Sequence, residues 1–208
     1  MARFKINNNI ICTQSYIMKK FIFFLLFVTF KSYSQNCNDL NLSINSKYSY
    51  TNETHDFSLP FNEGWKIMLE NQKAIIVSLT DPMQFASASV MLNQNGYPIP
   101  SAHSINDQMV RELANMVGSR IGNDFKILTT KKSYIKNIKV NIVEYEYLIK
   151  NLDDEYQMTG IMFQIVKKQN YTFVYMFNCL KSLRNCYVPF FTNVMKQAYF
   201  GQEWYSLN

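Results

Sequence analysis

The histidines that could support catalysis are few and poorly spaced. Only two histidines occur, His55 and His103. A zinc site would need cysteine, histidine or carboxylate partners at short ligand spacings, and none of these spacings is present. His55-Asp56 beside Ser58 contains the residue types of a catalytic triad, but neighbouring residues on a strand point to opposite faces. No G-x-S-x-G motif occurs, so we interpret these residues as the entry to a strand.

Two acidic groups offer a second kind of chemistry. Glu144 and Glu146 are two residues apart, so on a strand they share one face. Paired carboxylates can divide acid and base roles when they lie about 5–9 Å apart. Ion pairing with lysines of neighbouring strands is the simpler interpretation, and the candidates are Lys131, Lys132 and Lys167.

The acidic turn Asp153-Asp154-Glu155 lacks the alternating ligands and the glycine of a calcium loop. No glycine-rich phosphate loop occurs either. The sequence therefore predicts no catalytic residue, no cofactor and no metal site, and we expect that the protein is not an enzyme.

The first 34 residues have the features of a secretory leader. Met18-Lys19-Lys20 is a basic start, residues 21–30 are apolar except for Thr29, and small residues precede Gln35. Ten residues of helix rise about 15 Å, half of a ~30 Å hydrocarbon core, so no stable membrane span is expected after processing. We expect a periplasmic or extracellular protein. The expected division is a start-site extension, a signal peptide, an extended lead-in and one domain, at residues 1–17, 18–34, 35–56 and 57–208.

The charge of the chain is concentrated in this leader. Residues 1–34 hold five basic side chains and no acidic one, whereas the remainder holds 16 basic and 15 acidic residues. The net charge of +6 therefore belongs mostly to the leader. A nearly neutral mature domain lacks the basic surface that a phosphate backbone needs, so nucleic acid is not an expected partner.

Four cysteines occur, at positions 12, 37, 179 and 186. Export permits disulfides. A strand that ends at Cys179 and a helix that begins near Cys186 would bring these two residues to bonding distance, so we predict a structural Cys179–Cys186 disulfide. Two buried thiols are the alternative. Cys37 would then be unpaired.

Apolar periodicity predicts an α+β domain with an antiparallel sheet. Strands are predicted from alternating or β-branched residues between turn signals, at residues 57–60, 65–69, 74–79, 86–92, 125–130, 138–149, 157–167 and 171–180. Residues 104–121 predict a helix that begins at Ser104 and has an apolar face at Ile105, Met109, Leu113, Met116, Val117 and Ile121. A second helix is predicted at 187–200, with Val188, Phe191, Val194, Met195 and Ala198 on one stripe. Both faces of the central strands are apolar, which indicates an α/β/α sandwich of about six to seven strands flanked by helices.

This order of elements resembles the PsbP-like superfamily, which includes the extrinsic protein of the photosynthetic oxygen-evolving complex, a yeast Ran-binding import factor and bacterial DcrB-like envelope proteins. The similarity covers residues 57–200. It is carried by Phe57-Ser58-Leu59-Pro60, Gly64-Trp65, the strand at 74–79 with Asp81-Pro82, and the small-residue strand at 86–92. The resemblance implies an accessory or binding role and assigns no functional residue.

Two further hypotheses stand beside an exported, non-enzymatic protein that binds an unknown protein partner. In the first, the domain carries a small apolar ligand between the sheet and the helix at 104–121, where Ala86 and Ala88 leave room. In the second, it is an enzyme of unknown class. A closed core would exclude the carrier, and a cavity with convergent polar groups would favour the enzyme.

Overall fold

The structure, a computed structural model, describes residues 37–72, 74–93, 107–119, 121–151, 154–167 and 171–204. The expected leader, His103 and the predicted helix cap Ser104 lie outside these residues. Within the described part of the chain, no helix has both the length and the apolar character needed to cross a membrane.

Seven antiparallel strands form the main sheet, in the order β3-β4-β5-β9-β8-β7-β6. The strands are β3 (Lys66–Gln72), β4 (Ile75–Thr80), β5 (Ala86–Asn93), β6 (Asn123–Ile135), β7 (Ile138–Asn151), β8 (Asp154–Lys167) and β9 (Tyr171–Leu180). Two meanders, β3 to β5 and β6 to β9, are joined where β5 pairs with β9. The two outer strands are therefore β3 and β6.

A second sheet is built from three short strands in the order β1-β2-β10. These are β1 (Asn45–Asn52), β2 (Phe57–Phe61) and β10 (Tyr199–Phe200). Residues 35–56 were expected to be an extended lead-in; their strand β1 pairs antiparallel with β2, with a register shift between Asn45 and Ser49. The described part of the lead-in therefore joins a sheet of the domain.

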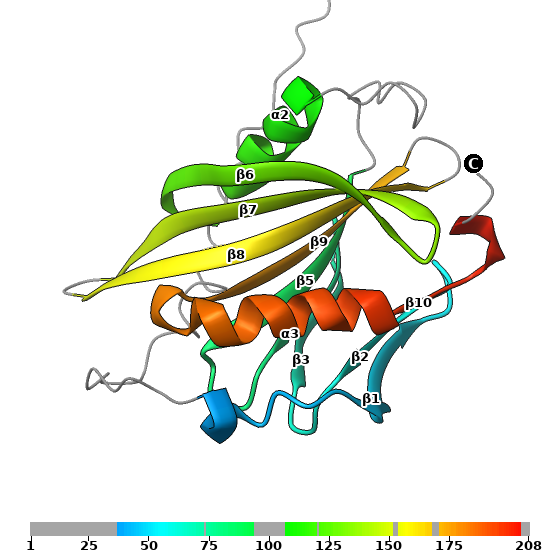
Figure 1. Ribbon diagram of the computed structural model, residues 1–208, viewed down its shortest axis with the longest axis horizontal. Coiled ribbons are helices and arrows are strands. Elements are labelled where there is room, and N and C mark those ends of the chain that lie inside the picture. The colour runs from blue at the N-terminus through cyan, green and yellow to red at the C-terminus, as the bar shows by residue number, and fades with distance from the viewer. Residues whose placement is uncertain are drawn as a thin grey trace, which may run out of the picture. The chain divides into compact units, whose positions relative to one another are not determined.

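Two helices cover opposite faces of the main sheet, as the sandwich architecture predicts. α3 (Arg184–Gln197) lies across β8 and β9, and α2 (Asp107–Gly118) lies against β6 (Figure 1). Phe191 of α3 stacks on Phe177 of β9 at 4.9 Å between ring centroids. On the other face, the side-chain amide of Gln164 donates to the backbone carbonyl of Val110 in α2. The small sheet shares the α3 face, because Phe57 of β2 meets Tyr175 of β9 at 5.6 Å.

The buried faces of the helices agree with the predicted stripes in part. In α3, Phe191, Val194 and Met195 are buried as predicted, and Val188 is half-buried; Ala198 is also buried, but it follows the end of the helix. In α2 the predicted Val117 is buried, together with Val110 and Ala114, whereas the predicted Leu113 and Met116 are half-buried. The predicted Ile105 and the side chain of Met109 lie outside the described part of the chain. Ala114 is 0% exposed, so the buried side of α2 is centred on this small side chain instead of on Leu113.

Candidate functional site

The outer strand β3 is the most exposed strand of the main sheet. Among the described residues it pairs only with β4, so its other edge carries unpaired backbone groups. Six of its seven residues are exposed, and Leu69 is half-buried. The alternation of Trp65, Ile67 and Leu69 predicts a half-buried strand; Trp65 and Leu69 are half-buried as this predicts, whereas Ile67 is exposed because the strand lies at the rim of the sheet.

A β-bulge places two apolar side chains at this rim. The register of β3 on β4 shifts between Ile67 and Leu69, so Met68 is the extra residue of β3. Ile67 is 53% exposed and Met68 is 41% exposed. Together with Leu69 they form an unbroken apolar run on an open edge.

The opposite outer strand, β6, carries lysines that oppose pairing with a strand of another chain. Proteins place lysines on open edges because a buried ammonium would oppose pairing with another chain. β6 carries exposed Lys126, Lys131 and Lys132, whereas β3 has one lysine, at its first residue. β3 is therefore the edge of this sheet on which lysine side chains do not obstruct an added strand.

More apolar surface lies at the N-terminal end of β3. Pro82 packs so closely on Gly64 that a Cβ there would lie 2.6 Å from the proline ring. The next residue, Met83, is 46% exposed. Tyr48 of β1 is 39% exposed, and the nearby Glu63 carboxylate raises the pKa of its phenol. We call β3 with Met83 and Tyr48 the β3 edge surface.

A rigid base lies under this surface. Trp65, directly before β3, stacks on Phe61 with ring centroids 4.6 Å apart and on Phe190 of α3 at 6.1 Å. Farther along the strand, Glu70 accepts a 3.0 Å hydrogen bond from the Tyr50 hydroxyl of β1. Both ends of β3 are thus fixed to the core while its outer edge stays open.

The acidic pair that could divide acid and base roles is neutralised by ion pairs. Glu144 pairs with Arg184 at the start of α3 and with Lys131 at 3.9 Å. Glu146 pairs with Lys181 at 2.8 Å. Pairing with Lys131 confirms the simpler interpretation for Glu144, while the partner of Glu146 comes from beyond β9 instead of a neighbouring strand.

His55 and Asp56 form part of the turn between β1 and β2. The backbone carbonyls of both residues accept hydrogen bonds from the Trp204 indole at 3.0 Å. The ring of His55 lies 5.2 Å from that of Phe173. This turn fastens the C-terminal segment to the domain, which agrees with a structural interpretation of these residues.

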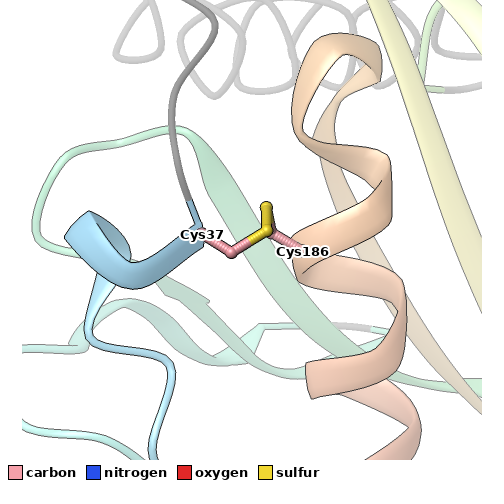
Figure 2. Close-up of a disulfide and its surroundings, with 2 residues drawn as sticks. All are labelled: Cys37 and Cys186. Atoms are coloured by element: carbon pink, nitrogen blue, oxygen red, sulfur yellow. A yellow bond between two sulfur atoms is a disulfide. The ribbon is translucent and has the colours of Figure 1, made fainter.

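The predicted disulfide is wrong. Cys186 of α3 bonds to Cys37, with 5.4 Å between Cα atoms (Figure 2). Cys179 is a buried free thiol. Burial raises the pKa of the Cys179 thiol to about 12. Cys179 lies on a sheet face under α3, with Thr159 and Ala86 as its cross-strand neighbours, so its side chain fills the core as a small apolar group.

The small residues expected to leave room for a ligand lie on the wrong face. Ala86 and Ala88 pair with Cys179 and Phe177, so they face α3 and not the helix at α2. They are 0% and 1% exposed within one core cluster that includes Phe191. On the α3 face, aromatic side chains fill the space beside these two alanines. The alanines therefore give no argument for an apolar ligand.

No group of histidine, cysteine and carboxylate side chains suited to hold a metal ion occurs within the described residues. Asp154 accepts a hydrogen bond from the Tyr156 hydroxyl, and Glu155 pairs with Lys150 at 3.5 Å. Asp153 lies outside the described part of the chain.

Comparison with known proteins shows the fold. No protein-family model and no curated protein sequence matches the chain. The structure is similar to the solution structure of cyanobacterial PsbP (CyanoP) from Synechocystis sp. PCC 6803, with a TM-score of 0.58, 10% identity, and coverage of 74% of this chain and 91% of that one. It is also similar to the Saccharomyces cerevisiae Ran-binding protein Mog1p, with a TM-score of 0.52, 9% identity, and coverage of 76% and 96%. The chain therefore has the PsbP-like α+β sandwich fold, and these similarities show the fold alone.

Proposed function

We propose that this chain is an exported, non-enzymatic accessory protein of the bacterial envelope that binds a protein partner through its β3 edge surface. The observation that carries the proposal is the contrast between the two outer strands. β3 has an exposed Ile67-Met68-Leu69 run on an open edge, and β6 has lysines. An extended segment of a partner could pair with such an edge through backbone hydrogen bonds and bury the apolar side chains beside it.

Two observations support an exported protein. Residues 18–34 have the basic, apolar and small-residue order of a signal peptide. The Cys37–Cys186 disulfide suits an oxidising compartment, because thiols stay reduced in the cytosol.

The PsbP-like fold of proteins such as the Ran-binding Mog1p supports a binding role, and the expected kinship with DcrB-like envelope proteins points in the same direction.

Site-specific crosslinking in intact cells tests this proposal. A photoreactive amino acid at Ile67 should give a discrete adduct with a single protein, whereas the same group at the exposed Asn193 of α3 should not. Adding Met68→Lys to the Ile67 probe should abolish the adduct, because a charge on the edge opposes strand pairing. Equal adducts from positions 67 and 193, or an adduct unaffected by the lysine, would contradict binding at this edge.

A further inference from the structure

Ile67 and Glu70 of the β3 edge surface share the face of the main sheet that carries α3. Ile67 pairs with Leu79 of β4, and Glu70 pairs with Val77. Leu79 pairs in turn with Ala88, which faces α3. Residues two apart on a strand point to the same face, so Val77 and its neighbour Glu70 face α3 as well. The β-bulge between them in β3 puts Ile67 and Glu70 on this common face.

Lys66 and Leu69 occupy the other face, where each pairs with a hydroxyl residue of β4. Each face of the β3 edge therefore offers one apolar and one charged side chain. The side chains of an added strand would also alternate between the two faces. Those on the α3 side would meet Ile67 and Glu70.

A chain of hydrogen bonds from β1 and the turn after it fixes the Glu70 carboxylate. The backbone N–H of His55 donates to Asn52 Oδ1 at 2.9 Å, and the Asn52 amide donates to the Tyr50 hydroxyl at 3.1 Å. That hydroxyl donates to Glu70 Oε1 at 3.0 Å. Asn52 and Tyr50 are 8% and 6% exposed, so the carboxylate is held at the surface by buried side chains. Bonds in such a chain polarise one another.

The fixed carboxylate retains the capacity to bind a cation. Glu70 is exposed, and within the described residues its Oε2 atom accepts no hydrogen bond and the side chain forms no ion pair. Glu144 and Glu146 of β7, in contrast, are both paired with basic side chains of the domain. An ion pair with a carboxylate that is already fixed loses less side-chain entropy than a pair between two mobile groups.

The charge around β3 has the same sign. Residues 37–72 contain five acidic and two basic side chains, and all five acidic ones are exposed. Residues 35–208 hold 16 basic and 15 acidic side chains in all, so the rest of the mature chain is positive. A negative field at this end would steer a cationic segment toward the β3 edge.

We infer that the protein partner of the β3 edge surface is an extended segment with a lysine or arginine opposite Glu70, next to an apolar side chain over Ile67. This inference rests on the proposed function and specifies the partner's chemistry. Backbone hydrogen bonds along the edge form with any sequence, whereas the ion pair selects the partner and its register. A slip of one residue would turn the basic side chain to the other face, where Lys66 repels it.

Photocrosslinking from position 67 in intact cells, combined with variants of Glu70, tests this inference. Glu70→Gln keeps an oxygen that accepts the Tyr50 hydrogen bond and removes the charge, so the adduct yield should fall about three- to tenfold. Glu70→Lys should abolish the adduct, because it sets two positive charges against each other. The matched control is Glu53→Gln, at an exposed carboxylate in the turn between β1 and β2, which should change the yield by less than about twofold.

The adduct also identifies the bound segment. Cleavage at acidic residues leaves lysine and arginine inside the peptides, and mass spectrometry should find one of them within about four residues of the crosslinked position. Replacing that residue by Glu in the partner should abolish the adduct with wild type and restore it with Glu70→Lys.

The outcomes separate this inference from the function on which it rests. Absence of any adduct from wild-type Glu70 would contradict binding at the β3 edge and this inference with it. An adduct as strong in Glu70→Gln as in Glu53→Gln, or a bound segment without a basic residue at that place, would overturn this inference alone.

Discussion

The Tyr187 hydroxyl donates a 2.8 Å hydrogen bond to the carboxylate of Asp81, which ties the first turns of α3 to the turn between β4 and β5. Asp81 is only 3% exposed and also accepts a 2.9 Å hydrogen bond from the backbone N–H of Ala86. Burial raises the pKa of Asp81 above its ordinary 3.8, although these hydrogen bonds oppose the rise. Because this turn also carries Met83, the pair helps to position one end of the β3 edge surface.

Removing the Tyr187 hydroxyl should destabilise the domain. Tyr187→Phe leaves the buried Asp81 carboxylate with one hydrogen bond fewer, so we expect a loss of about 1–3 kcal/mol in the free energy of unfolding, measured in urea. Tyr199→Phe removes a hydroxyl from a side chain that is 55% exposed and should change stability by less than about 0.5 kcal/mol. Equal effects of the two substitutions would contradict a structural role for the Tyr187–Asp81 bond.

The raised pKa of Asp81 has a consequence for pH dependence. In the pH interval above 3.8 and up to the raised pKa, the folded state binds a proton at Asp81 more tightly than the unfolded state does. The contribution of Asp81 to stability should therefore fall as pH rises through that interval. Asp81→Asn cannot titrate, so the stability of wild type minus that of the variant should decline with rising pH in urea titrations at a series of pH values. A difference that stays constant or rises would contradict the direction of the shift.

Local pattern was sufficient to predict most elements and not their arrangement. Periodicity placed β9 and the buried stripe of α3 correctly because each depends on residues close together in the chain. The strand order does not follow from periodicity, so periodicity alone did not mark β3 as an outer strand. The one local sign is the run Ile67-Met68-Leu69, which breaks the alternation where the bulge occurs.

The sequence did not predict which face of β5 carries Ala86 and Ala88, or which cysteine bonds to Cys186. Both depend on contacts between segments that are far apart in the chain. Small or apolar residues occupy both faces of β5, so the pattern could not say whether Ala86 and Ala88 face α2 or α3. Cys37 and Cys186 are 149 residues apart, and they meet only because the N-terminal segment that carries Cys37 lies against α3 in the folded protein. Cys179 was closer in sequence, but its side chain belongs to the sheet core.

The Cys37–Cys186 disulfide predicts a specific thiol chemistry. The oxidised, processed protein should show no reactive thiol when folded and one thiol, Cys179, after denaturation, because burial raises its pKa to about 12. Cys37→Ser and Cys186→Ser should each lower stability by about 2–5 kcal/mol, and the double variant should lose no more than either single one. If Cys179 and Cys186 were the bonded pair, Cys37→Ser would leave stability unchanged and peptide mapping would recover the other crosslink.

Processing of the leader is testable by N-terminal sequencing of the exported protein. We expect Gln35 as the first residue, because Ser32 and Ser34 provide the small side chains that signal peptidase requires. Ser34→Leu should block cleavage and leave residues 18–34 attached. Recovery of the apolar segment 21–30 in the mature wild-type protein would contradict a cleaved signal peptide.

Gly160 is where the sheet leaves no space for a side chain. It lies on β8 between Tyr145 of β7 and Asn178 of β9. The Tyr145 ring crosses it so that the hydroxyl can donate to the Asn178 side chain at 2.7 Å. A Cβ at position 160 would lie 2.5 Å from the Tyr145 hydroxyl and 2.5 Å from the Phe177 carbonyl. Gly160→Ala must therefore displace the ring and break its hydrogen bond.

We expect Gly160→Ala to destabilise the domain by about 3 kcal/mol or more, since overpacking and a lost buried hydrogen bond act together. Urea denaturation of a double-mutant cycle with Tyr145→Ala separates the two contributions. Removing the Tyr145 ring relieves its contact with the added methyl group and leaves the contact with the Phe177 carbonyl, so the effect of Gly160→Ala should be clearly smaller. Strictly additive effects would show that the ring is not what excludes a side chain at position 160, because two groups in contact must couple when either one is removed.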